Sequence, residues 1–145
     1  MKMKYVFSPK NPTRYTFPTH INDLLIDRSE SETSEVFIVV IEPNNAPPSH
    51  KHNDTEQIFY ILEGQGVLEI GKRGIPTYTE TVFPGEVVRI PPRTYHTIHC
   101  QGDHPLKYLA IDCFVEGKPK EEPTWDSHVE VLCKEQGWDY SQVKK

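Results

Sequence analysis

The chain has 145 residues, a formal net charge of -5 at pH 7 and hydrophobic residues at 36% of its positions. A chain of this length can bury roughly 70% of the surface of its unfolded form, so one compact domain with a single core is expected. Negative charge spread along the sequence argues against a nucleic-acid or anionic-membrane surface, and no apolar run approaches the ~18 residues of a membrane span.

Cysteine usage indicates the compartment. The three cysteines are unevenly spaced and form no CxxC pair, which indicates free thiols in a reducing environment rather than a disulfide framework. The first residues carry lysines but no apolar core of a secretion signal. A cytoplasmic protein is therefore expected.

In chain order, the sequence predicts short strands separated by turn residues, which is typical of an all-β sandwich or barrel. Residues 1–35 are expected to form an extension with strand character that packs on a barrel at residues 36–116. The strand at residues 36–41 is apolar on both faces, so both faces must be covered. The outer cover could be the N-terminal segment, the C-terminal helix or a partner subunit, and we expect a homodimer. Further strands are expected at residues 24–27, 57–63, 66–70, 86–90, 96–100 and 106–114, with loops at 43–49, 71–79 and 101–105.

The C-terminal segment, residues 117–145, contains one short amphipathic helix. Ser127 and Glu130 have the spacing of a capping box, and an apolar stripe runs through Trp125, Val129, Leu132 and Cys133 before Gly137. This helix is expected to pack on the barrel as a structural cover or, alternatively, as a lid over a pocket.

The candidate metal site begins at His50 and His52. Side chains alternate along an extended strand, so two histidines one residue apart share a face and can reach one ion. A third imidazole from a later strand and an oxygen from Gln57 or Glu56 would complete four protein ligands and leave open positions for water or substrate. Strict alternation continues from the histidines to Glu56, although the turn-forming residues 53–55 interrupt that strand.

These residues lie in a pattern that resembles the two motifs of the cupin superfamily. His50, His52, Gln57 and Gly64 match the first motif, and Gly85, Pro91 and His96 match the second. Arg93 and Cys100 stand where that family usually has glycine and asparagine, and neither position is a metal ligand there.

The resemblance implies a double-stranded β-helix, also called a jelly roll, and one divalent ion bound by His50, His52, Gln57 and His96. Counting back from Gly64, as the family motif does, favours Gln57 over Glu56. Three imidazoles and a neutral amide leave the ion its full charge, which makes it a stronger Lewis acid. Zinc, nickel, iron and manganese all suit such ligands.

Asp112 is the candidate catalytic residue, because an acid interrupts the apolar strand at residues 106–114 and a buried carboxylate needs a partner or a task. The Asp112-x-Phe114 ending resembles small cupins that ring-open unsaturated uronates, in which the matching acid works beside the metal. Tyr108, on the same strand face as Asp112, is a candidate substrate-binding residue. Arg89 either projects into the pocket to hold a substrate carboxylate or lies on the outer face in an ion pair.

The expected function is metal-dependent chemistry on a small polar metabolite, such as a sugar acid or a hydroxy-carbonyl compound. Lewis-acid polarisation with proton transfer would give isomerisation, tautomerisation, lyase chemistry or decarboxylation. The alternatives are a dioxygenase and a binding protein that holds a small molecule without turning it over. Neither nucleic acid nor a membrane is an expected partner.

Overall fold

The computed structural model describes residues 3–72 and 74–144, so residues 1, 2 and 145 of the expected terminal segments and residue 73 of the expected 71–79 loop lie outside it. The strands are β1 (Thr13–Thr16), β2 (Ile21–Ile26), β3 (Ser34–Ile41), β4 (Thr55–Glu63), β5 (Gln65–Lys72), β6 (Ile75–Val82), β7 (Val87–Ile90), β8 (His96–Gln101) and β9 (Leu106–Phe114). The helices are the 3-10 turn η1 (Arg28–Glu30), α1 (Trp125–Gln136) and α2 (Tyr140–Val143).

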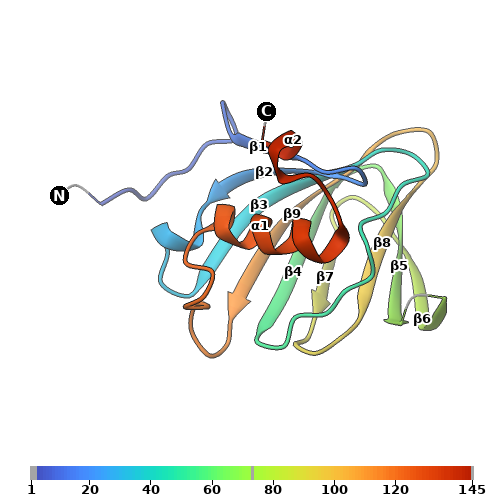
Figure 1. Cartoon of the computed structure of the whole chain (residues 1–145). Helices are drawn as coiled ribbons and strands as arrows, with labels where there is room; N and C mark the ends of the chain where they lie inside the picture. The colour runs from blue at the N-terminus through green and yellow to red at the C-terminus, as the bar shows by residue number, and fades with distance from the viewer. Residues whose placement is uncertain (1–2, 73, 145) are drawn as a thin grey trace.

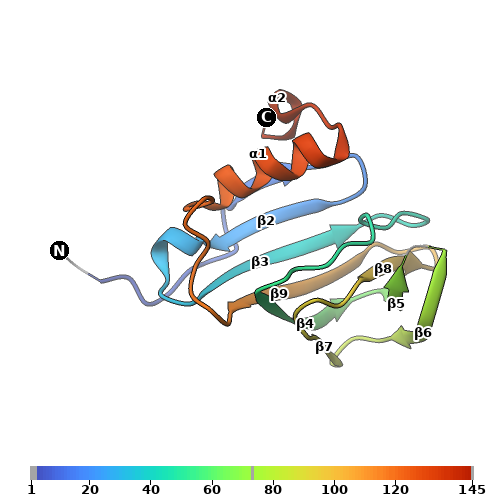
Figure 2. The ribbon, with the colours of Figure 1, turned by 60° about the horizontal axis from the view of Figure 1, so that its bottom comes forward.

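Two antiparallel sheets form the barrel (Figure 1). The larger sheet has the order β1-β2-β3-β9-β4-β7, and the smaller has the order β6-β5-β8. The sheets face each other, and α1 lies next to the N-terminal strands (Figure 2). The predicted all-β double-stranded β-helix with a short C-terminal helix is confirmed.

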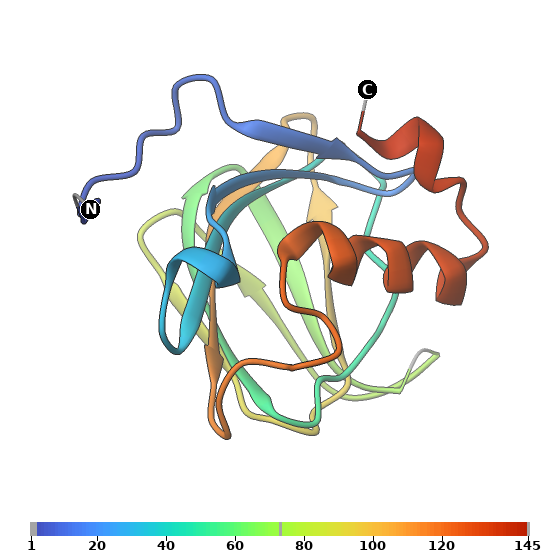
Figure 3. The same ribbon diagram turned by 60° about the vertical axis from the view of Figure 1, so that its left-hand side comes forward.

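The N-terminal segment joins the larger sheet instead of covering one of its faces. β2 pairs antiparallel with β3, and β1 pairs with β2, so these two strands widen the sheet at one edge. Before β1, the chain runs away from the barrel (Figure 3), and Met3, Tyr5 and Val6 are exposed there. These strands therefore extend the sheet beside β3.

The core lies between the two sheets. Phe37, Ala110 and Phe59 are register partners across β3, β9 and β4, and all three are buried. They share the inner face because alternate residues of a strand point to the same side. The same alternation brings the polar side chains of Glu35, Asp112 and Gln57 inside.

Two expectations about secondary structure were wrong in detail. The 71–79 loop is instead the tip of a hairpin between β5 and β6, with Ile70 paired to Tyr78. Helix α1 starts three residues earlier than the proposed capping box, because Thr124 is the N-cap and Ser127 is its reciprocal partner. The side-chain oxygen of Thr124 accepts from the Ser127 N–H at 3.0 Å, which satisfies an amide that the helix leaves free.

Gly64 makes the turn from β4 to β5 at a φ of +79°. A Cβ atom there would stand 2.3 Å from the Pro105 carbonyl oxygen, so only glycine fits this close approach of two chain segments. Among the described residues, no helix is long and apolar enough to cross a membrane.

Candidate metal centre

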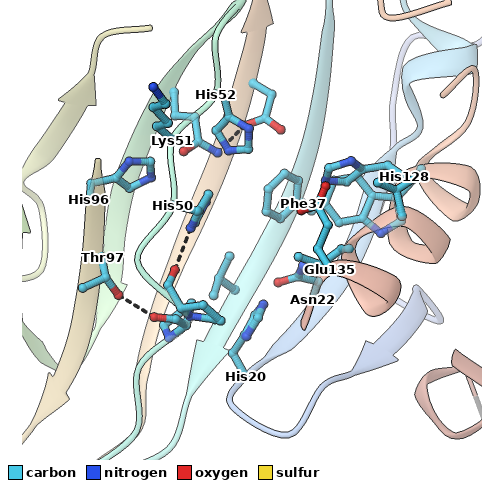
Figure 4. Close-up of a pocket in the computed structure, with 18 of the residues that line it drawn as sticks. His20, Asn22, Phe37, His50, Lys51, His52, His96, Thr97, His128 and Glu135 are labelled. Carbon is cyan, nitrogen blue, oxygen red and sulfur yellow. Dashed lines mark hydrogen bonds between the residues drawn. The ribbon is translucent and has the colours of Figure 1, made fainter. Parts of the chain in front are cut away.

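The three histidines of the motifs, His50, His52 and His96, lie together on one side of a cavity and are called the histidine cluster below (Figure 4). His50 and His96 form an antiparallel bridge, in which the His96 N–H donates to the His50 carbonyl at 3.0 Å. Their ring centres are 4.6 Å apart, and that of His52 is 4.9 Å from His50 and 6.2 Å from His96. Residues from two distant parts of the chain are thus brought together by strand pairing.

Backbone carbonyls orient two of these rings. Nδ1 of His50 lies 2.7 Å from the Pro48 carbonyl oxygen, and Nδ1 of His96 lies 2.9 Å from that of Thr94. A carbonyl can only accept, so each Nδ1 carries the proton and each Nε2 keeps a free lone pair. This arrangement is the usual outer support of a metal-binding histidine.

Arg93 supports the segment that carries His52. The backbone of Arg93 has a φ of +62°, a left-handed conformation that favours glycine, the residue usual at this position of the cupin motif. Its N–H donates to the His52 carbonyl at 2.5 Å, and its guanidinium donates to the Asn53 carbonyl at 3.2 Å. Arginine in place of glycine therefore keeps the turn, and its side chain adds a hydrogen bond to the residue after His52.

Gln57 faces the cavity from β4, and its neighbour Glu56 faces outward. The Gln57 amide nitrogen donates to Oδ1 of Asp112 at 2.7 Å. Its Oε1 is buried and has no hydrogen-bond partner. Because Asp112 fixes the nitrogen, the free end of the amide is an oxygen, the kind of atom that can ligate a cation.

Burial keeps the histidine cluster neutral. Burial, with a smaller contribution from the neighbouring His50, lowers the pKa of His52 and of His96 to about 3. Burial is also the largest cause of the lowered pKa of His50. Neutral imidazoles bind metal without first releasing a proton, so these rings are prepared as ligands at pH 7.

The donor atoms fit a cation, although they are not fully assembled around one. Nε2 of His52 and of His96 is buried without a partner, as is Oε1 of Gln57. Within residues 3–72 and 74–144, no three His, Cys, Asp or Glu side chains already stand in a metal-binding arrangement. Rings bound to one ion through nitrogens ~2.1 Å away have centres roughly 4.5–5.5 Å apart. The 6.2 Å separation between the ring centres of His52 and His96 is longer than this range, which applies to adjacent ligands of one ion.

A row of buried charges extends from Gln57 across the sheet. Asp112 is the register partner of both Gln57 and Glu35. Arg28 binds both carboxylate oxygens of Glu35, at 2.8 and 3.0 Å. Burial, together with Asp112, raises the pKa of Glu35 to about 9 against the opposing effect of Arg28. Glu35 therefore accepts a proton more readily than an ordinary carboxyl group, because burial and the neighbouring Asp112 both disfavour its negative charge.

The other predicted site residues separate into two groups. Tyr108 and Asp112 are buried and line the cavity, and burial raises the pKa of Tyr108. Arg89 lies on the outer face, where its guanidinium donates to Glu56 at 3.0 Å. Of the two alternatives for Arg89, the structure shows the ion pair on the outer face, so a substrate-binding role in the cavity was wrong. Glu56 as the alternative metal ligand was also wrong. Alternation along β7 and β4 points both side chains away from the barrel interior.

The cavity has a volume of about 610 Å³, and its far wall consists of residues that sequence reasoning did not assign. They include His20, just before β2, Asn22 from β2, and Trp125, His128 and Glu135 from α1. His128 and Glu135 are seven residues apart, so they share a helix face. This spacing could have indicated that the two side chains share one face of the helix. It does not indicate which side of the barrel the helix covers.

Comparison with known sequences accounts for part of this site. Residues 37–112 match the family described as Cupin domain, a range that contains the histidine cluster, Gln57 and Asp112. The chain is 40% identical over 61 residues to an uncharacterized protein of Methanocaldococcus jannaschii, covering 42% of the chain and 45% of that protein. It is 27% identical over 106 residues to the acireductone dioxygenase of Exiguobacterium sibiricum, covering 69% of the chain and 58% of that protein. The chain thus spans about half the length of these curated relatives.

Comparison of structures agrees on the architecture. The polyketide cyclase RemF from Streptomyces resistomycificus superposes with a TM-score of 0.66 at 24% identity, covering 81% of the chain and 83% of that protein. At this level of identity the likeness shows a shared fold and leaves the reaction open.

Proposed function

The chain belongs to the cupin superfamily, and from this premise we propose that it is a metal-dependent enzyme that acts on a small polar metabolite. His50, His52, His96 and Gln57 would hold one divalent ion. The substrate class would be a sugar acid or a hydroxy-carbonyl compound, and the reaction an isomerisation, tautomerisation, lyase reaction or decarboxylation.

The observation that carries this proposal is the set of unpartnered donor atoms at one end of the cavity. An unsatisfied buried polar atom costs about 1–3 kcal/mol, so native proteins keep few of them. Two imidazole nitrogens and one amide oxygen without partners lie at this end. A divalent cation would satisfy all three at once.

The bound ion would supply Lewis-acid polarisation of a ligand oxygen. The chain's own residues would do the rest. Asp112 orients Gln57 through its hydrogen bond and, from the same cavity wall, can accept or donate a proton. Phe59 and Tyr108, whose ring centres are 4.8 Å apart, make this end of the cavity apolar and strengthen electrostatic interactions inside it.

A dioxygenase remains the second candidate, and what supports it is the likeness to acireductone dioxygenase over 69% of the chain. The two candidates differ in the metal they require, since oxygen chemistry needs a redox-active ion such as iron or nickel, whereas zinc serves Lewis-acid chemistry. The third candidate is a protein that binds a small molecule without turning it over. Metal content alone does not distinguish such a protein from the metal-dependent enzyme.

The test begins with the metal content of protein purified without a nickel column. One equivalent of a divalent ion per chain is expected, and zinc, which has no redox chemistry, would argue against the dioxygenase. His96→Gln should weaken metal affinity by about 10-fold or more, since an imidazole ligand is replaced by a weaker and differently placed one. His99→Gln is the matched control, because His99 lies on the opposite face of β8. Equal affinity of the His96 variant and the wild type would contradict the proposed site.

A further inference from the structure

The cavity extends well beyond the histidine cluster. Figure 4 shows His50, His52 and His96 on one side, with Asn22 and His128 on the other. The second group belongs to β2 and α1, which lie outside the residues that match the Cupin domain family. The wall opposite the metal end is therefore built by elements outside the matched family range.

Unpartnered polar atoms are concentrated in this one cavity. Among the described residues, six buried side-chain polar atoms lack a hydrogen-bond partner, and five of them belong to residues that line it. Three are the atoms at the metal end. The other two, Oδ1 of Asn22 and Nε1 of Trp125, belong to the opposite wall. A metal ion at the histidine cluster leaves these two atoms unexplained.

The two atoms have complementary chemistry. An indole N–H can only donate a hydrogen bond, and an amide oxygen can only accept one. Asn22 and Trp125 are 4% and 3% exposed, so bulk water does not solvate them. Trp125 packs against Phe37 and Tyr15, and Tyr15 is the register partner of Asn22. A hydroxyl group both donates and accepts, so the hydroxyls of one ligand could satisfy both atoms.

His128 adds a third polar group to this wall. Its Nδ1 lies 2.6 Å from Oε1 of Glu122, and its ring lies 5.4 Å from that of Trp125. Because the Glu122 carboxylate accepts the Nδ1 proton, Nε2 is the ring nitrogen left for a ligand. The His128 side chain is 24% exposed, so a ligand in the cavity can reach it. The hydrogen bond from His128 also lowers the pKa of Glu122, which keeps that carboxylate ionised as an acceptor.

We propose that Asn22, Trp125 and His128 form a second subsite that binds a hydroxyl-bearing part of the ligand, across the cavity from the histidine cluster. The proposal rests on the proposed function in one respect, namely that the same ligand reaches the metal end. A cavity of about 610 Å³ is within the size range of sites for metabolite-sized ligands. The ligand would then be a polyhydroxylated acid rather than a two-carbon or three-carbon acid.

The indole N–H signals provide a direct test, because the chain has two tryptophans. The Trp138→Phe variant assigns the Trp125 signal in a nitrogen-proton correlation spectrum. Zinc-loaded wild-type protein is titrated with galacturonate and, as the matched probe, with cyclohexanecarboxylate, which keeps the ring and the carboxylate but has no hydroxyls. Galacturonate should shift the Trp125 signal, and cyclohexanecarboxylate should bind at least 10-fold more weakly, as expected when buried polar groups stay unpaired.

Variants test the same subsite independently. Asn22→Leu and His128→Phe should each weaken galacturonate binding about 10-fold, whereas Asn45→Leu, in an exposed loop, should not. Equal binding of the two probes, an unmoved Trp125 signal, or unchanged affinity in both variants would each overturn the subsite. If zinc does not bind, the proposed function fails instead, and the same titration of metal-free protein still decides the subsite by the Trp125 signal.

Discussion

At the scale of single residues, the orientation of the Gln57 amide depends on Asp112. The hydrogen bond of 2.7 Å from Nε2 to Oδ1 turns the amide oxygen toward the cavity. Without an acceptor at position 112, the amide would have no reason to prefer this orientation. Two substitutions separate this positioning role from a role in proton transfer, because asparagine keeps an acceptor oxygen and leucine does not.

Asp112→Asn should therefore leave zinc affinity close to that of the wild type, whereas Asp112→Leu should weaken it about 10–100-fold, the usual effect of losing an outer partner of a metal ligand. Isothermal titration calorimetry measures both. Once a substrate is known, Asp112→Asn should still reduce turnover by ~100-fold, since a carboxamide cannot carry the proton. Equal loss of zinc affinity in the two variants would contradict the positioning role.

His20 should make folding stability depend on pH. Burial lowers its pKa in the folded protein to about 3, and its ring stacks on Phe17 at 4.7 Å. The unfolded chain has the ordinary value near ~6.5, so below that pH the unfolded state binds more protons than the folded state. The contribution of His20 to stability is complete above pH ~6.5 and is lost as the pH falls toward 3, by at most about 1.4 kcal/mol per pH unit.

Urea unfolding of metal-free protein at pH 7 and pH 5 measures this effect. His20→Phe should lose less stability between the two pH values than the wild type. His104→Phe is the control, because His104 is exposed. Equal losses in His20→Phe and the wild type would show that this ring is protonated without cost in the folded protein.

At the scale of elements, the strands best predicted from the sequence are those with one face toward the core and the other toward solvent. β8 and β9 alternate between buried and less buried residues throughout, and β4 does so up to Leu62. Period-two alternation is the signal that sequence patterns carry. β6 was taken for a loop because six of its eight residues are exposed, so it has no apolar periodicity. β1 was missed for the same reason, since only Tyr15 is buried in it.

The candidate site divides in the same way. The histidine cluster and Gln57 could be assigned from motif spacing, because neighbouring strand positions fix which side chains share a face. The opposite wall could not, since it depends on where α1 docks. That position is set by long-range contacts, such as the backbone N–H of Trp125 donating to the Asp27 carboxylate at 3.1 Å and the Tyr15 hydroxyl donating to Asp126. No local pattern encodes such contacts.

At the scale of the whole molecule, the outer face of the larger sheet is apolar. Ile38, Leu109, Tyr60 and Val87 are register partners in one row across β3, β9, β4 and β7. Tyr60 and Val87 are 44% and 63% exposed. Helix α1 contributes to the cavity lining on the inner side, so it does not cover this row. Large exposed apolar patches commonly mark surfaces that bind another molecule.

This row leads to the prediction that the protein is a homodimer with a two-fold interface through the outer face. Such an interface brings the same patch of each copy together, and a stable one should bury more than roughly 1,000 Å² in total. Val87→Glu should shift the protein toward monomer in light scattering coupled to size-exclusion chromatography, because two carboxylates would then meet at the symmetric contact. Ile75→Glu is the matched control, since Ile75 is 72% exposed on the smaller sheet.

Both variants replace an exposed aliphatic residue by the same acid, so they change the net charge equally and differ chiefly in location. A monomer at every wild-type concentration would contradict the dimer itself, and equal behaviour of the two variants would contradict this interface. The two proposed subsites both lie on the inner side of the larger sheet. Val87→Glu should therefore leave zinc affinity unchanged even where it breaks the dimer, because its side chain and the cavity lie on opposite faces of that sheet.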